Sequence, residues 1–277
     1  MICLCFVRDC GAIQHRRIWD HTRNEMTETG SQWKQLRVMP EPDLSLLDNP
    51  VWHAITGPQK DLAESIGTAG RYRPEVSPFG GIADVTGMAS LVDLLSPGET
   101  VLLAGVESAP APDFDHLELL MSVPVHQMLC VQPVHRAPDS QSEVATDLVQ
   151  LGSADSDAMV ALATLTEPGP FVHETHRLGR YYGIFDDGEL VAMAGERFTM
   201  PGFVEVSGVC THPTARGKGY ASLLVHHLVQ KSHERGEWSF LHVRIGSPSE
   251  TSAVGVYARL GFSHHQKMTV HVVRRRP

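Results

Sequence analysis

Residues 205–224 read EVSGVCTHPTARGKGYASLL, and the character of the sequence changes twice along them. Apolar and polar residues alternate in the first part, which predicts a strand. Pro213 marks a turn, and Gly217 and Gly219 form a short loop before a helix that we expect over Tyr220–Arg235. Because glycine lets the backbone bend tightly, several N–H groups at the helix start can point at one anion, and a diphosphate would fit.

The loop resembles the acetyl-CoA-binding segment of the GNAT superfamily of N-acetyltransferases. The family pattern is Arg or Gln, two residues, Gly, one residue, then Gly or Ala, and here it is Arg216-Gly217-Lys218-Gly219-Tyr220-Ala221. A second motif matches the family's closing helix and turn, which is Tyr, two residues and Leu-Gly-Phe, as Tyr257-Ala258-Arg259-Leu260-Gly261-Phe262. The motifs stand in the family's order, and the resemblance covers residues 145–277, nearly half of the chain.

The elements expected around the motifs follow the same family order. Two strands, over 180–185 and 189–195, are joined by Asp186-Asp187-Gly188, a strong hairpin signal because Asp and Gly accept positive φ. Beyond the helix at 220–235 we expect a strand over 238–245, a helix over 252–260 and a strand over 267–273. The fold class is therefore α/β, with a mixed sheet flanked by helices and an acyl-CoA-binding, GNAT-like fold at the C-terminus.

The first half of the chain has a different organisation. Residues 1–39 show no core-forming periodicity, and we interpret them as a disordered or non-native extension. Helix, strand and turn signals alternate over 40–131, including a helix at 86–95 and a strand at 99–105, which predicts a smaller α/β accessory domain. A degenerate copy of the C-terminal fold is the alternative for that domain. Proline and serine crowd residues 132–144, which predict a linker.

Composition excludes several classes of function. The net charge is −9, and residues 40–140 hold 14 acidic against 4 basic side chains, which argues against a nucleic-acid partner. No apolar run is long enough to span a membrane, so we expect a soluble, cytoplasmic protein without a membrane partner. The five cysteines form neither a disulfide ladder nor a paired metal motif, so no metal is expected. The terminal Arg274-Arg275-Arg276 is interpreted as a solvated end.

The resemblance implies acetyl-CoA as cofactor and the residues that hold it. Its diphosphate would bind backbone amides at the positive end of the helix. Its pantetheine arm would pair with the preceding strand as a further strand would. The Val209 N–H, or its neighbour, is the implied donor to the thioester oxygen. The implied binding residues are Val209, Cys210, Thr211, Arg216, Gly217, Lys218, Gly219, Tyr220 and Ala221.

Glu205 is the implied base. It lies eleven residues before Arg216, and relatives that keep a glutamate there use it to deprotonate the amine, often through water. Glu205, Ser207 and Val209 would alternate on one face of the strand, which would place Glu205 on the side of the cofactor. The alternatives for the base are Glu196 on the preceding strand and water, and the structural alternative for Glu205 is an ordinary exposed strand glutamate.

Tyr257 is the implied acid, because many relatives place this tyrosine near the sulfur of coenzyme A. The structural alternative is a core aromatic residue of an amphipathic helix. One departure concerns position 250, where the family commonly has an asparagine that contacts the cofactor and this chain has Glu250. A negative charge is unfavourable next to a phosphate-bearing ligand, so Ser249 or Thr251 would have to substitute.

Together these features predict an acetyl-CoA-dependent N-acetyltransferase. The acetyl group would pass to a primary amine by direct attack in a ternary complex, and the N-terminal domain would help to shape the acceptor cleft. The alternatives are a non-catalytic acyl-CoA-binding or regulatory protein with this fold, and a plain α/β interaction protein. The acceptor, a small-molecule or peptide amine, is not encoded by any motif, because acceptor pockets in this fold are built from variable loops.

Overall fold

The computed structural model describes residues 42–105, 116–131 and 147–277. The predicted extension at 1–39 and the predicted linker at 132–144 lie outside these ranges. Within them, eleven strands form one sheet in the order β1-β2-β3-β4-β11-β5-β10-β9-β8-β7-β6. No helix in the same ranges is long and apolar enough to cross a membrane.

The C-terminal half follows the predicted order of elements. Its elements are β6 (Val149–Leu151), η3 (Ser153–Asp155), α4 (Ser156–Thr166), η4 (Thr175–Leu178), β7 (Tyr181–Asp186), β8 (Glu189–Met200), β9 (Phe203–Thr211), η5 (Pro213–Ala215), α5 (Tyr220–Glu234), β10 (Trp238–Arg244), α6 (Glu250–Arg259) and β11 (Phe262–Arg275). Strands β6 to β9 are antiparallel neighbours, and β10 lies parallel to β9. Asp187 and Gly188 both have positive φ in the turn between β7 and β8, which confirms the predicted hairpin.

The N-terminal half repeats one connection of the C-terminal half. Its elements are the short helices η1 (Leu44–Asp48) and η2 (Lys60–Leu62), with α2 (Pro50–Ile55), β1 (Ala63–Ile66), β2 (Ala69–Tyr72), β3 (Phe79–Ile82), α3 (Gly87–Leu94), β4 (Thr100–Gly105) and β5 (Leu117–Cys130). Strand β3 lies parallel to β4, and α3 connects them, as α5 connects the parallel strands β9 and β10. A degenerate copy would keep this connection, and that interpretation stays a prediction.

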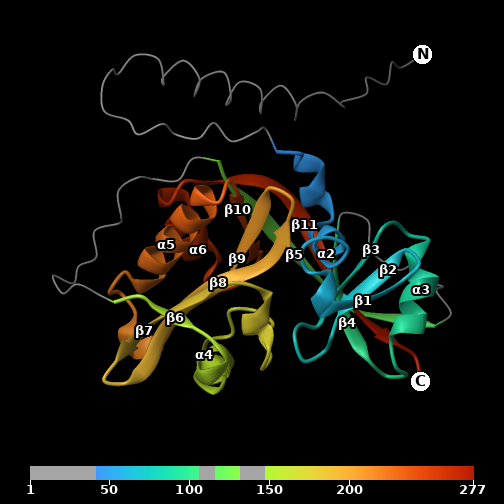
Figure 1. Ribbon diagram of the computed structural model, residues 1–277, viewed down its shortest axis with the longest axis horizontal. Helices are drawn as coiled ribbons and strands as arrows, with labels where there is room; N and C mark the ends of the chain where they lie inside the picture. Colours follow the sequence, from blue (N-terminus) through green and yellow to red (C-terminus); the bar gives the residue numbers. More distant parts are fainter. Residues whose placement is uncertain (1–41, 106–115, 132–146) are drawn as a thin grey trace, which may run out of the picture. The chain divides into compact units, whose positions relative to one another are not determined.

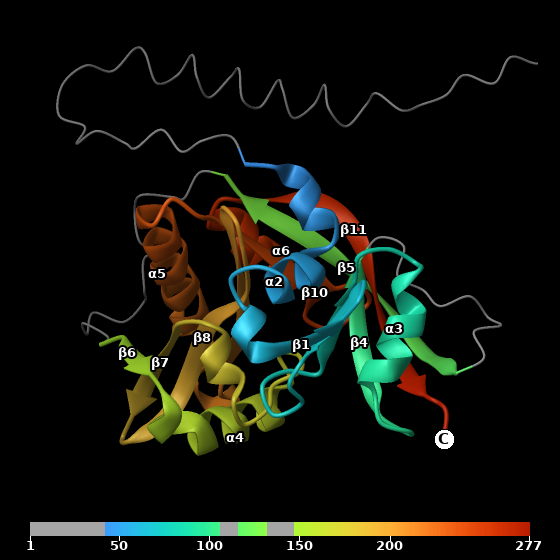
Figure 2. The same ribbon diagram turned by 45° about the vertical axis from the view of Figure 1, so that its right-hand side comes forward.

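Two long strands join the halves. Strand β11 pairs with β4 through Thr269–Arg274 and with β5 along most of its length, while β5 also pairs with β10 through Val125–Cys130. Figures 1 and 2 show β5 and β11 running from one half to the other. The stretches predicted as an accessory domain and a GNAT domain therefore share one sheet, and the described part of residues 40–131 does not form a separate domain.

Helices cover both faces of the C-terminal part of the sheet. On one face, Leu224 and Leu228 of α5 pack with Val206 of β9. On the other face, Met159 of α4 packs with Cys210 of β9. Helix α2 packs against both β3 and β8, so the halves also share side-chain packing. Burial of these apolar surfaces is the main favourable term that fixes the sheet in place.

Of the arginines predicted to form a solvated end, Arg276 is exposed as expected, whereas Arg274 and Arg275 are held by partners. Arg274 Nη2 lies 2.7 Å from Glu118 Oε2 on the neighbouring β5. Arg275 donates to the Val92 carbonyl at 3.0 Å and to the Leu95 carbonyl, both at the end of α3. A cation at a helix C-terminus satisfies carbonyls that lack helical partners, so Arg275 caps α3.

Candidate active site

The parallel strands β9 and β10 separate partway along their length. Their backbone pairing covers Phe203–Trp238, Val204–Ser239 and Glu205–Phe240. Both strands continue, to Thr211 and Arg244, without a further pair between them in this fully described part of the chain. The facing edges of their C-terminal ends are therefore left for another hydrogen-bonding partner.

A β-bulge lies in β9 at the point of separation. Pairing with β8 passes from Met193–Cys210 to Gly195–Ser207, and Gly208 has φ +62°, a conformation that favours glycine. The extra residue reverses the alternation, because Val206 and Val209 both pack on the α5 side whereas Cys210 packs on the α4 side. The predicted shared face of Glu205, Ser207 and Val209 is therefore wrong, and Glu205 and Val209 lie on opposite faces of the sheet.

The glycine loop has the predicted form at the start of α5. Gly217 and Gly219 both have φ +82°, and the Leu223 N–H donates to the Gly219 carbonyl at 3.1 Å as the helix begins. The first N–H groups of a helix have no partner within it, so the amides that follow Gly219 can bind an anion. Lys218 Nζ lies 3.3 Å from Asp186 Oδ2 at the exposed rim of this loop.

Glu205 is enclosed in an ion pair. Its carboxylate is 0% exposed and accepts from Arg197 Nε and Nη2, each at 2.7 Å, while His242 Nδ1 lies 2.6 Å from Oε1. Burial alone would raise the pKa of Glu205, but the Arg197 charge and the hydrogen bonds from Arg197 and His242 lower it to about 2. The interpretation as an exposed strand glutamate is wrong.

Side chains from both halves surround this ion pair. The Arg197 guanidinium lies 4.8 Å from the ring centroid of Phe79 on β3 and 4.6 Å from that of Phe198. His242 Nε2 lies 3.2 Å from the amide nitrogen of Gln127 on β5, and that nitrogen donates to the Leu47 carbonyl at 3.0 Å. The carboxylate is thus held by side chains of two neighbouring strands, β8 and β10, and the N-terminal half covers the ion pair.

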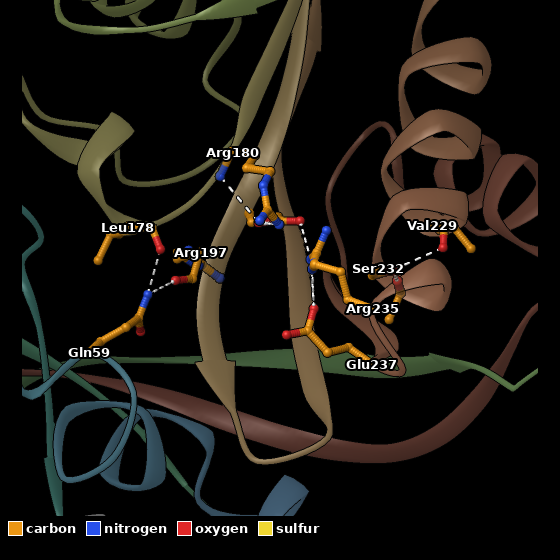
Figure 3. Close-up of polar contacts among 10 residues, drawn as sticks. Gln59, Leu178, Arg180, Arg197, Val229, Ser232, Arg235 and Glu237 are labelled. Atoms are coloured by element: carbon orange, nitrogen blue, oxygen red, sulfur yellow. Dashed lines mark hydrogen bonds and ion pairs between the residues drawn. The ribbon is translucent and has the colours of Figure 1, made fainter. Parts of the chain in front are cut away.

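Glu196, the alternative base, is also buried and paired. Its side chain is 4% exposed. Oε1 lies 2.6 Å from Arg235 Nη2, and Oε2 accepts from the Arg180 N–H at 3.2 Å. Figure 3 shows Arg180 and Arg235 beside β8, with Glu237 next to Arg235. This pair ties β8 to the C-terminal end of α5.

Tyr257 lies on α6 and packs against the α5 core. Its ring makes an edge-to-face contact with Phe262 at 5.9 Å. Burial, with a smaller contribution from the Cys210 thiol of β9, raises the pKa of Tyr257 to about 12. The hydroxyl is therefore protonated at neutral pH and lies near the separated part of β9, which suits both the implied acid and the core aromatic residue.

Glu250 is anchored within its own loop. One oxygen lies 3.0 Å from His126 Nε2 on β5, and the other accepts from the Gly246 N–H at 2.6 Å. The Gly246 N–H and His126 lower the pKa of Glu250. This contact could not be predicted from the local sequence, because His126 lies on β5, far from Glu250 along the chain. Within the ranges that the structure describes, no group of three or more His, Cys, Asp or Glu side chains could hold a metal ion.

Comparison with known proteins identifies the family. The FR47-like protein family matches residues 181–271. A GNAT-family protein from Novosphingobium aromaticivorans is 34% identical, covering 83% of this chain and 99% of its own, with a TM-score of 0.72. No curated protein sequence matches this chain.

Two more distant structures share the fold. The GCN5-related N-acetyltransferase from Kribbella flavida has 17% identity and a TM-score of 0.51, over 76% of this chain and 88% of its own. A Drosophila protein has 12% identity and a TM-score of 0.50, over 96% of this chain and 89% of its own. The glycine loop, the separated parallel strands and the identity to the Novosphingobium protein agree, and the chain belongs to the GNAT family of acetyltransferases.

Proposed function

We propose that this chain transfers an acetyl group from acetyl-CoA to a primary amine, with both ligands bound at once. The amine nitrogen would attack the thioester carbon, the carbon–sulfur bond would break, and the amide and the free thiol would leave. The observation that carries the proposal is the glycine loop at the start of α5, placed directly after a strand whose free edge faces that of β10.

The residues present fit the cofactor. Backbone amides of Arg216–Ala221 would hold the diphosphate, and the free edge of Val209–Thr211 would hold the pantetheine arm. A side chain at Gly217 would meet nothing within 4 Å, so the loop has open space in front of it. Acetyl-CoA supplies the acyl group, and the bulge at Gly208 leaves the Val209 N–H as the candidate donor to the thioester oxygen.

Tyr257 is the candidate acid in this proposal. A tyrosine with a pKa of about 12 keeps its proton at neutral pH. It can therefore donate a hydrogen bond, and then the proton, to the departing thiolate.

The proton of the ammonium group leaves by another route than Glu205. A carboxylate with a pKa of about 2 is a far weaker base than an amine, whose conjugate acid has a pKa of about 10. Both oxygens of Glu205 are occupied, and Glu196 is occupied as well. Of the three predicted routes, loss of the proton to water is the one that these ion pairs leave open.

Thiol release tests the proposal. The protein is incubated with acetyl-CoA and, in turn, glycine, spermidine and a lysine-containing peptide, and amine-dependent release of free thiol is expected with at least one of them. The buried ion pairs of Glu205 and Glu196 favour one second candidate, a non-catalytic acyl-CoA-binding protein. Binding of acetyl-CoA without release on a broad amine panel would support that candidate.

A further inference from the structure

The segment between α4 and β7 faces the bulge of β9. A methyl group added at Gly208 would lie 3.2 Å from the Tyr181 ring and 3.8 Å from the Phe171 ring. The two rings are themselves in edge-to-face contact at 5.6 Å. Phe171 begins residues 171–178, here called the 171–178 segment, so the start of this segment lies beside the backbone that would hold the thioester.

We infer that the N-terminal half holds the 171–178 segment in place, and that Thr175 and Gln59 are positioning residues for the amine acceptor. The inference rests on the proposed function, because it concerns the approach of an amine to the thioester. The N-terminal half would thus help to position the amine, whereas the glycine loop would bind only the cofactor.

Thr175 attaches the middle of the segment. Its hydroxyl donates to the Val76 carbonyl at 2.9 Å and accepts from the Val172 N–H at 2.8 Å. The neighbouring Glu174 N–H donates to the Glu75 carbonyl at 3.0 Å. Thr175 is 2% exposed, so water cannot replace these partners. The segment is thereby tied to the connection between β2 and β3.

Gln59 attaches the end of the segment. Its amide nitrogen donates to the Leu178 carbonyl at 2.7 Å and to the Arg197 carbonyl at 2.6 Å, as Figure 3 shows. Its oxygen accepts from the Tyr72 hydroxyl and from the Thr199 N–H at 3.3 Å. A primary amide has two N–H donors and two acceptor positions, so this buried side chain is fully used. It joins the 171–178 segment, β8 and β2 at one point.

These contacts predict a selective effect. Loosening the segment would disturb the side from which the amine approaches, whereas the diphosphate would bind at residues 216–221, which take no part in these hydrogen bonds. If the substitutions merely destabilised the whole fold, the affinity for the amine and the affinity for acetyl-CoA would fall together. The two cases can therefore be told apart by measuring each ligand separately.

The test uses two variants of the full chain, one rescue variant and one matched control. Thr175→Val keeps the shape of the side chain and removes both hydrogen bonds, and Gln59→Met removes the amide. Each is expected to raise the KM of the most active amine among glycine, spermidine and the lysine peptide about tenfold, with the Kd of acetyl-CoA unchanged within about twofold. Hydrogen exchange of the amides of residues 172–178 should become faster, and Thr175→Ser should restore wild-type values.

Asn49→Ala is the control. It removes a hydrogen bond of 2.7 Å from Asn49 Nδ2 to the Ile82 carbonyl, which lies within the N-terminal half and does not involve the 171–178 segment. It should leave the amine KM at the wild-type value. Unchanged exchange and KM in both test variants, or an equal loss of acetyl-CoA affinity, would overturn the inference. Absence of amine-dependent thiol release in the wild type would instead contradict the proposed function. Hydrogen exchange would still report whether Thr175 and Gln59 hold the 171–178 segment in place.

Discussion

At the scale of single residues, the ion pair of Glu205 should be visible as a pH dependence of stability. The folded pKa of about 2 lies below the ordinary value of 4.5, so the unfolded chain binds more protons on acidification. The stabilisation is complete above the unfolded pKa and is lost as the pH falls through about 2. Its full size is roughly 3 kcal/mol.

Urea unfolding followed by tryptophan fluorescence at a series of pH values checks this. The free energy of unfolding of the wild type should fall between pH 5 and pH 2 by roughly 3 kcal/mol more than that of Glu205→Gln. At neutral pH the variant should be about 3–5 kcal/mol less stable, because it leaves the buried Arg197 charge without its partner. Equal pH slopes in the two proteins would contradict the assigned ion pair.

Turnover of Glu205→Gln separates a structural glutamate from a catalytic one. If the ion pair only supports the fold, the turnover per folded molecule should stay within about threefold of the wild type, since general bases contribute about 10²–10⁴-fold. The measurement is thiol release at a temperature where both proteins are folded, as judged by circular dichroism. A hundredfold loss would return the role of base to Glu205.

Tyr257 should behave in the opposite way. Tyr257→Phe keeps the ring that packs against Phe262 and removes only the hydroxyl, so kcat should fall about a hundredfold while the Kd of acetyl-CoA stays the same. Tyr182→Phe, whose ring packs against the same α5 core, is the control and should keep full activity. Equal activity of both variants would leave Tyr257 as a core residue only.

At the scale of elements, the bulge of β9 makes a prediction of its own. Gly208→Ala forces a side chain into φ +62° and brings it to 3.2 Å from the Tyr181 ring, so it should reshape the strand at the thioester position. Gly202→Ala, in the turn between β8 and β9, meets similar strain at φ +79° with nothing within 4 Å. Both should cost about 1–2 kcal/mol of stability, and only Gly208→Ala should lower kcat. An equal kcat in Gly208→Ala and Gly202→Ala would show that the bulge has no part in catalysis.

The same elements show which parts of the fold can be predicted from sequence. Helix α5 and strand β10 begin and end within a residue of the predicted bounds, because local apolar periodicity and glycine turns determine them. Strand β5 was missed. Its alternation is interrupted by exposed Leu119, Leu120 and Met121 and by Pro124, and its partners β10 and β11 lie more than a hundred residues later in the chain.

In the candidate site, too, features set by local sequence could be predicted, and features set by contacts between distant strands could not. The glycine loop was predictable because positive φ at Gly217 and Gly219 is a local requirement. The environment of Glu205 was not, because Arg197 and His242 reach it from two other strands. A bulge in β8, where Arg197 and Phe198 lie opposite Glu205, sets the register of that contact, and no local pattern encodes it.

At the scale of the whole molecule, the described part of the sheet carries two connections in which a helix joins a pair of parallel strands, and only one of them is suited to an anionic cofactor. In the N-terminal connection, the Asp84 carboxylate lies before α3 and accepts from the Thr86 N–H at 2.8 Å, so a negative charge already occupies that helix start. In the C-terminal connection, Gly217 and Gly219 leave the start of α5 open. The chain should therefore bind one acetyl-CoA.

Calorimetric titration of acetyl-CoA into the wild type, Gly217→Asp and Gly236→Asp tests this account most directly. Both glycines have φ +82° and nothing within 4 Å of an added side chain, so the substitutions carry similar strain, and only Gly217 lies in the loop before α5. The account predicts one site per chain in the wild type, a loss of affinity of at least about tenfold in Gly217→Asp from charge repulsion, and wild-type affinity in Gly236→Asp. No binding to the wild type at millimolar acetyl-CoA, or equal affinity of all three proteins, would contradict it.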